Sequence, residues 1–175
     1  MVEYSISMSN RLESPAALEP ADSEVYRRVC GRFATGVTVI SVLDAEGRPH
    51  GMTINSFASL SLAPPLVMVS INLRNGLLKH FLQSTHFAVN VLAHDQEHHS
   101  RRFARHAEDR FQGVNWQGAE SGTPLIEGAL AYLECSNTRW FEAGDHAVLI
   151  GEVLRAGCRD GRPLVFFQSD YASLE

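Results

Sequence analysis

The 175-residue sequence predicts a mainly β protein, folded as a closed or nearly closed barrel with short helices at its ends. About seven segments have the composition of strands, whereas only about three short segments space their apolar residues as helices do. The helices do not alternate regularly with the strands, and no GxGxxG motif follows the first strand, so a Rossmann dinucleotide fold is disfavoured. The length suits one domain with a full core.

The chain is expected to begin with a tail and a short helix. Residues 1–22 are rich in Ser, Glu and Pro and are expected to be flexible, while residues 23–175 form the domain. Ser23 can cap a helix that runs to about Phe33. Apolar residues recur in this helix every four positions and should make its buried face, namely Val25, Val29 and Phe33.

Three strands are expected next. The β-branched segment 36–43 is followed by turn residues at 44–47, and residues 48–55 return as the second strand. Residues 66–72 form the third. Because apolar and polar residues hardly alternate in that segment, both of its faces should be buried.

Two further helices are expected on either side of a strand at residues 86–92. Asp95 can cap a polar, Arg-rich helix that runs to about His106 and exposes its charged face to solvent. Asn75 can cap the other helix, which runs to about Gln83. The apolar side of this second helix consists of Leu77, Leu78, Phe81 and Leu82.

The last third of the chain contains an irregular segment and then more strands. Residues 107–128 are Gly-rich and irregular, and two long strands over residues 130–141 and 146–156 form a hairpin. A last strand is expected at residues 163–168. Two aromatic residues should anchor the irregular segment, Phe111 and Trp116.

Composition and charge exclude several classes of function. The net charge of −5 argues against nucleic acid or an anionic membrane surface as a partner. No apolar run reaches the ~18 residues of a membrane span, and the N-terminus lacks a secretory pattern, so a cytoplasmic protein is expected. Three cysteines without CxxC spacing favour a reducing compartment and should be small core or strand residues, namely Cys30, Cys135 and Cys158.

The segment from Gly51 to Ser70 is the most informative part of the chain. It interleaves hydroxyl and amide side chains with apolar ones and contains a Pro64–Pro65 corner. A core strand does not need so many hydroxyl groups, because each must find a hydrogen-bond partner once it is buried. A strand that enters a polar loop and returns as another strand can instead hold a flat, polar-edged ligand against a sheet.

The histidines offer two candidate sites. His94 and His98 have helical spacing that can hold a metal, but their segment is polar and no Cys or paired carboxylate joins them, so no metal site is predicted. His146 follows Asp145 and opens an apolar strand, where it can contact a ligand edge or hydrogen-bond the backbone of a turn. A contact between these two side chains is not assumed, because neighbours on a strand point to opposite faces.

Six segments together resemble the flavin reductase-like family, which has the FMN-binding split barrel. The resemblance covers about residues 24–174 and is most specific in its second and fifth segments. The matching segments are FATGVTVIS (33–41), GMTINSFASLSLAPPLVMVSI (51–71), HFAVNVL (86–92), LAYLEC (130–135), GDHAVLIGEV (144–153) and PLVFFQSDY (163–171).

The resemblance implies a six-stranded split barrel that forms a homodimer with flavin at or near the interface. It also implies an NAD(P)H:flavin oxidoreductase that reduces FMN or FAD with NADH or NADPH and supplies reduced flavin to a partner monooxygenase. His146 would be the catalytic residue, placed near the flavin and the nicotinamide. The implied cofactor-binding residues are Thr35, Gly36, Val37, Thr38, Asn55, Ser56, Phe57, Ala58, Ser61, Leu62, Asn72, Arg74, Asn75, Lys79, His146 and Tyr171.

The chemistry leaves other functions open. Hydride transfer between two bound ring systems needs no protein nucleophile or metal. This agrees with a sequence in which neither a nucleophile motif nor a metal site is predicted. The same barrel can also serve a non-enzymatic flavoprotein that carries electrons. Two further alternatives are a binding module with an empty flavin site and a His-rich metal protein.

Overall fold

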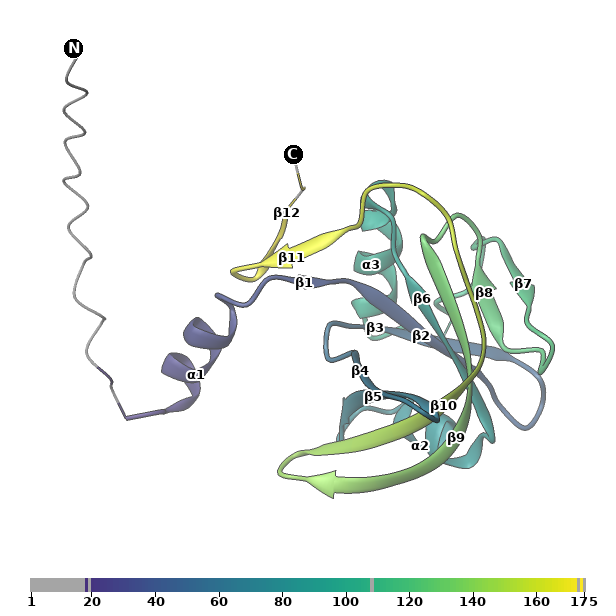
Figure 1. The fold of residues 1–175 in the computed structure, drawn as a ribbon, viewed down its shortest axis with the longest axis horizontal. Helices are drawn as coiled ribbons and strands as arrows, with labels where there is room; N and C mark the ends of the chain where they lie inside the picture. The colour runs from purple at the N-terminus through teal and green to yellow at the C-terminus, as the bar shows by residue number, and fades with distance from the viewer. Residues whose placement is uncertain (1–17, 19, 108, 173, 175) are drawn as a thin grey trace, which may run out of the picture.

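The computed structural model describes residue 18, residues 20–107, residues 109–172 and residue 174, and it is built around one curved antiparallel sheet (Figure 1). The mainly β fold is therefore confirmed. The sheet has seven strands in the order β3-β2-β6-β9-β10-β5-β4. Their bounds are β2 Thr38–Leu43, β3 Pro49–Ile54, β4 Ala58–Leu62, β5 Pro65–Asn72, β6 His86–Val91, β9 Ala131–Ala143 and β10 His146–Cys158.

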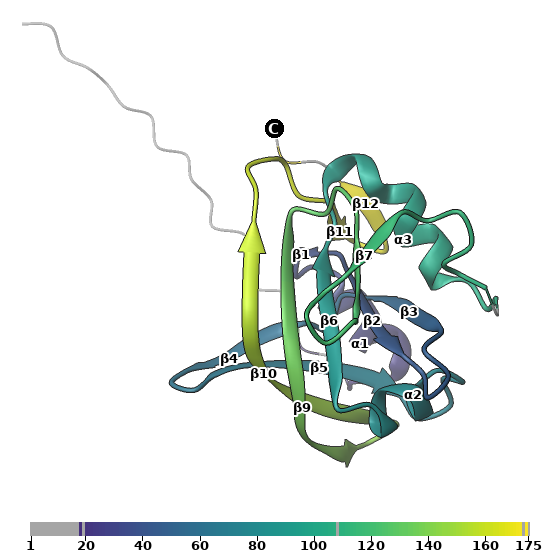
Figure 2. The same cartoon turned by 90° about the vertical axis from the view of Figure 1, so that its right-hand side faces the viewer.

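The helices and the smaller sheets surround this sheet. Helix α1 is Ser23–Cys30, α2 is Leu78–Gln83, and α3 is Glu97–Ala104 after a 3-10 turn at His94–Gln96. In both views α3 and α2 lie toward opposite ends of the sheet, as expected for helices at the ends of a barrel (Figures 1 and 2). The short strands are β1 Thr35–Gly36, β11 Val165–Phe167 and β12 Asp170–Ala172 in one sheet, and β7 Trp116–Gly118 and β8 Pro124–Ile126 in another.

Strand β2 packs against hydrophobic residues on both of its faces. Ile40 and Val42 belong to one core cluster, which also contains Phe81 of α2. Val39 points to the other face and belongs to a second cluster, which includes Phe103 of α3. Because side chains alternate along a strand, this one segment lies inside two cores at once.

A buried polar network joins β2 to β8. The amide nitrogen of Asn90 donates to the Val39 carbonyl and contacts the Ser41 hydroxyl, each at 3.0 Å, while its amide oxygen accepts from the Ile126 N–H at 2.7 Å. The Ser41 hydroxyl donates to the Pro124 carbonyl. These bonds provide hydrogen-bond partners for polar groups that could not otherwise be buried without a large cost.

The first helix differs from the sequence prediction in its cap and in its buried face. Asp22, and not Ser23, is the N-cap, since its carboxylate accepts from two backbone N–H groups of the first turn. The described residues leave most of the predicted apolar face uncovered, because Val25 is only half-buried and the exposed fractions of Val29 and Phe33 are 62% and 78%. In Figure 1, α1 stands away from the main sheet and connects to it through β1.

The caps of the other helices also differ from the prediction. Asn75 closes a turn, because its side-chain oxygen accepts from the Leu77 N–H at 3.0 Å, and α2 begins afterwards without a side-chain cap. Asp95 lies inside the 3-10 turn and does not cap α3. The predicted apolar side of α2 does pack against the core, whereas α3 is not wholly polar because it buries Phe103.

Several strands were missed or misjudged. Residues 66–72 do form a strand, but its burial alternates, with one face in the core and the other half-buried, so the prediction of two buried faces was wrong. Short strands β4, β7, β8 and β12 were not predicted, and β4 raises the sheet to seven strands. The two anchors of the irregular segment differ, since Phe111 is buried and Trp116 is partly exposed.

The three cysteines have no disulfide partner. Cys135 is buried in β9, and burial raises the pKa of its thiol to about 12. Cys158 is an exposed strand residue, whereas Cys30 is exposed on α1 and so does not fit the expectation of a core or strand position.

Two predictions concern the ends of the chain and the membrane. Most of the tail predicted at residues 1–22 lies outside the described residues, so it stays a prediction.

Among the described residues, no helix combines the length and apolar character that crossing a membrane requires.

Candidate functional site

A cavity of about 200 Å³ lies where β3 ends, between α3 and the β11–β12 hairpin. Three of its lining residues, Val37, Asn55 and Tyr171, were predicted site residues that are far apart in the sequence. The cavity is therefore the place where the fold brings part of the predicted site together. The complete lining is Val37, Thr53, Ile54, Asn55, Ser100, Ala104, Phe166 and Tyr171.

Hydrogen bonds link three walls of this small cavity. The Thr53 hydroxyl donates to the Ser100 carbonyl at 2.6 Å, and the Ser100 hydroxyl lies 2.7 Å from the Tyr171 hydroxyl. The Arg101 guanidinium lies over the Tyr171 ring, 4.8 Å from its centroid. Neither Ser100 nor Arg101 was predicted as a site residue, since nothing local in the sequence connects them to the last strand.

The residues from Thr35 to Thr38 lead into this region. The Thr35 hydroxyl is buried and has no hydrogen-bond partner among the described residues. Gly36 is exposed with open space beside it, while the Thr38 hydroxyl donates to the Ile54 carbonyl at 3.1 Å. Thr38 thus stabilises the pairing of β2 and β3, whereas the buried Thr35 hydroxyl stays without a partner among the described residues.

The predicted residues around β4 divide into internal and exposed positions. Ser56 donates to the Ser70 carbonyl at 2.8 Å and accepts from the Ser70 N–H at 3.2 Å, so its hydroxyl fixes the entry to β4. Phe57 packs against the core. Ala58 and Leu62 are exposed and Ser61 is half-buried, and the 95% exposed fraction of Leu62 leaves an apolar side chain at the sheet edge.

His146 lies at the tip of the β9–β10 hairpin and contacts its neighbour. Its Nδ1 atom is 2.7 Å from the Asp145 carboxylate, a contact that the sequence argument did not assume. This hydrogen bond holds the pKa of Asp145 below its usual value. Because a carboxylate only accepts, Nδ1 carries the proton, and Nε2 has no partner among the described residues.

Asn72 connects this histidine pair to β5. It lies opposite His146 in the strand register, and its amide nitrogen donates to the Asp145 carboxylate at 3.3 Å. Its amide oxygen accepts from the Arg74 N–H at 2.9 Å. These predicted residues form a second group, and His146 lines neither the small cavity nor the larger one described next.

A larger cavity of about 870 Å³ lies between the start of β3, α2 and the segment around residue 107. Two predicted residues, Asn75 and Lys79, line it together with Arg110, whose exposed fraction is only 8%. Arg110 donates to the Gly51 carbonyl at 2.9 Å, and burial lowers the pKa of its guanidinium. The other lining residues are Arg48, Pro49, His50, Gly76, Leu77, His80, His106, Ala107 and Asp109.

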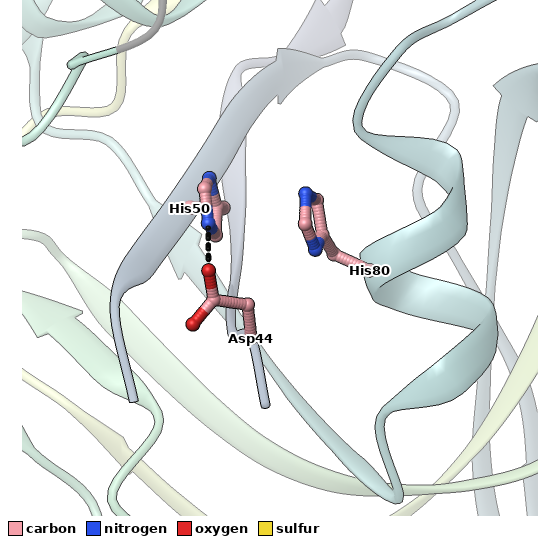
Figure 3. Close-up of side chains that lie close together, drawn as sticks. All are labelled: Asp44, His50 and His80. Atoms are coloured by element: carbon pink, nitrogen blue, oxygen red, sulfur yellow. Dashed lines mark hydrogen bonds and ion pairs between the residues drawn. The ribbon is translucent and has the colours of Figure 1, made fainter. Parts of the chain in front are cut away.

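Two of these lining histidines form a cluster with Asp44 (Figure 3). His50 Nε2 lies 2.9 Å from the Asp44 carboxylate, and the His50 and His80 rings stack with centroids 4.2 Å apart and planes 6° apart. The ligand atoms lie within 4.8 Å of one another, which suits a metal by distance. However, nitrogen lone pairs lie in the ring planes, so two parallel rings do not direct them at one ion.

The other contacts of Asp44 favour a structural role for this cluster. Its carboxylate also accepts from the Glu46 and Arg48 N–H groups and from the Arg48 guanidinium, which closes the β2–β3 turn. This cluster was not predicted, because His80 lies 30 positions beyond His50 in the sequence. The histidines considered as a metal site were His94 and His98, and no group of three metal-capable residues containing them is found in the described part of the chain.

Comparisons with known proteins show the family to which the chain belongs. The model of the flavin reductase-like domain matches residues 30–175. The chain is 46% identical over 145 residues to the FMN reductase (NADH) SmoA of Agrobacterium fabrum, covering 83% of this chain and 82% of that protein. It is 37% identical over 164 residues to HsaB of Rhodococcus jostii, the reductase subunit of a flavin-dependent monooxygenase, covering 93% and 84%.

A solved structure is similar over nearly its whole length. It is the NADH:FAD oxidoreductase SgcE6 of Streptomyces globisporus in complex with NAD and FAD fragments. The TM-score is 0.85 at 39% identity, and the match covers 91% of this chain and 97% of that one.

The Asp44 cluster predicts an acid-dependent loss of stability. The His50 and Arg48 contacts outweigh desolvation and hold the pKa of Asp44 well below its usual value. A lowered folded-state pKa stabilises the fold above the unfolded pKa, and this stabilisation is lost as the pH falls below about 4. Asp44→Asn should therefore unfold more easily than the wild type at neutral pH, and the difference should shrink in acid, as measured by urea unfolding at each pH.

A matched substitution controls for acid effects on the whole fold. Asp160→Asn changes an exposed aspartate whose carboxylate makes no hydrogen bond or ion pair among the described residues, so its stability should follow the wild type at every pH. A constant difference between the wild type and Asp44→Asn from neutral to acidic pH would contradict the prediction.

Proposed function

Because this chain belongs to the flavin reductase-like family, we propose that it is an NADH-dependent flavin reductase. It oxidises NADH, reduces FMN or FAD, and releases the reduced flavin to a separate monooxygenase component. The observation that carries this proposal is the 46% identity to an NADH-dependent FMN reductase over 83% of the chain. The resemblance to a monooxygenase reductase subunit supports the monooxygenase as the recipient.

The described residues fit a flavin and a nicotinamide nucleotide. The exposed amide of Asn55 offers a polar partner for a ring edge beside the apolar Val37, and the buried Thr35 hydroxyl nearby in the sequence has no partner among the described residues. The larger cavity is lined by Lys79 and Arg110, which suit a phosphate group. We therefore assign the ring systems to the end of β3 and the phosphates to the larger cavity.

When bound, the two nucleotides supply the redox chemistry, in which a hydride passes from the reduced nicotinamide to the flavin. The chain has to hold the two rings in contact and limit the access of water. Backbone N–H groups of residues 55–61 would favour the negative charge of the reduced product. His146 lies outside both cavities, so it would offer its free Nε2 to the part of the bound nucleotide that extends beyond the cavity at the end of β3, as an orienting group rather than an obligate acid.

We also propose that two copies associate through α1. Tyr26, Val29 and Phe33 expose large apolar surfaces on or next to this helix, and no described part of the same chain covers them. An amphipathic helix gains most of its stability by burying its apolar face. A second copy of the chain would cover it and so complete the helix packing.

The direct test of the function is NADH oxidation by the purified protein with added FMN or FAD. We expect turnover that rises with free flavin and then saturates, with NADPH as the comparison donor. Retention of yellow flavin through gel filtration without turnover would instead support an electron carrier. Absence of both turnover and bound flavin would leave a binding module on the same barrel.

His146→Ala should weaken the use of NADH more than it weakens the fold. We expect the KM for NADH to rise about tenfold, the change that follows from losing one good hydrogen bond. The side chain is half-exposed, so the free energy of unfolding should change by about 0.5 kcal/mol or less. Unchanged kinetics with NADH would remove His146 from the site.

The mass in solution tests the proposed association. Light scattering should give the wild type twice the chain mass of 19.3 kDa, and the Val29→Glu/Phe33→Glu variant should shift toward one chain. Gln117→Glu adds charge on β7, at the other end of the molecule from α1 (Figure 1), and should leave the mass unchanged. A wild type with the mass of one chain would contradict the proposal.

A further inference from the structure

We propose that Ser100 and Arg101 of α3 are positioning residues, which hold the Tyr171 ring as the wall of the small cavity that receives the nicotinamide ring of NADH. This inference rests on the proposed function and adds a site for the hydride donor. It concerns two residues that neither touch the reacting atoms nor belong to any segment of the family resemblance.

The hydrogen bond of Ser100 is the first observation. Ser100 is fully buried in α3, where a serine hydroxyl commonly bonds to a carbonyl of its own helix. Here its contact is instead the Tyr171 hydroxyl at 2.7 Å, 71 positions further along the chain. A buried hydroxyl is costly without a partner, so the contact fixes both side chains.

The carbonyl of Ser100 is fixed as well. It accepts the Thr53 hydroxyl at 2.6 Å, which ties this turn of α3 to β3. Three walls of the small cavity, on β3, α3 and β12, are thus connected through one residue. A shift of Ser100 would move Tyr171 relative to the end of β3.

Arg101 supports the Tyr171 ring independently. Its guanidinium lies 4.8 Å from the ring centroid and is itself held by Glu97, whose carboxylate accepts from it at 2.6 Å. A cation over an aromatic ring attracts it through the ring quadrupole. Phe166 packs against the same ring in an edge-to-face arrangement, with centroids 5.6 Å apart.

Tyr171 needs this support because its own strand is weakly held. Strand β12 has three residues and pairs only with β11, which in turn pairs with β1 at just two positions. Such a short hairpin is marginal by itself. The contacts from α3 therefore determine where the ring lies.

The size of the cavity indicates what it receives. About 200 Å³ is less than the ~300 Å³ at which typical ligand pockets begin, so it suits one ring and not two stacked ring systems. Hydride transfer requires the second ring to lie against the first. We assign the smaller ring, the nicotinamide, to the cavity, and the flavin to the open surface of residues 55–62.

Ser100→Ala tests this assignment in the full-length protein. A loosened Tyr171 ring has to be ordered again by each NADH molecule, so at saturating flavin the KM for NADH should rise about 3- to 10-fold. No reacting atom is touched, so kcat and the KM for flavin should stay within about twofold. Arg101→Gln should raise the same KM about two- to fivefold.

Tyr171→Phe makes the test specific. It removes the same hydrogen bond from the other side and keeps the aromatic ring that packs against the second core cluster. It should match Ser100→Ala, and the double variant should show no further rise in KM. Additive effects, or a KM for NADH that is unchanged in both single variants, would overturn the proposal.

Ser121→Ala is a control that removes a hydroxyl–hydroxyl contact elsewhere. Ser121 is exposed, and its hydroxyl contacts the Thr123 hydroxyl at 3.0 Å, near β8 and away from the cavity, so the kinetics of this variant should equal those of the wild type. A wild type that fails to oxidise NADH with either flavin would overturn the proposed function. An active wild type with normal Ser100→Ala and Tyr171→Phe variants would overturn this inference alone.

Discussion

Strand β2 is covered by hydrophobic residues on both faces, and the positions of the other elements follow from this constraint. One face packs against the hydrophobic cluster that includes α2, and the other packs against the cluster that includes α3 and β8. The strand still contains a serine, so a second strand has to bring Asn90 to the same place to satisfy it. Packing on two sides and one polar network thereby define which elements meet around the barrel.

The same constraint places the candidate site at the end of β3. Helix α3 covers the second face of β2. The buried side of α3 therefore contacts both the edge strand β3 and the β11–β12 hairpin. The elements there are short and partly exposed, whereas the centre of the sheet is closed. The candidate ligand-binding groups thus lie on short segments that are positioned by packing against the core, while their own side chains stay partly outside it. This is common for binding sites on rigid scaffolds.

Much of the fold could be predicted because local patterns carry it. A β-branched run predicted β2, apolar segments predicted the long strands, and glycine-containing turns predicted the two hairpins. Short strands such as β4 and β12 have no pattern of their own and exist only through pairing with neighbours. The face of α1 was misjudged for a related reason, since periodicity shows that a face is apolar but not whether the rest of the same chain covers it.

The site could be predicted only where a motif marks it. Asn55 and Tyr171 lie in segments that resemble a family, whereas Ser100 gains its role from a residue at the other end of the chain. The pair of His50 and His80 is likewise formed by packing, across 30 positions of sequence. Contacts of this kind depend on tertiary structure, and no spacing rule reveals them.

The buried cysteine gives the molecule a built-in reporter. Cys135 sits in the middle of the sheet, between β6 and β10, and its raised pKa keeps the thiol protonated and unreactive while these strands remain paired. Cys30 and Cys158 are exposed and need no such opening to react. The labelling rate of the buried thiol therefore records how often the sheet opens at Cys135, whereas the two exposed thiols record only the supply of reagent.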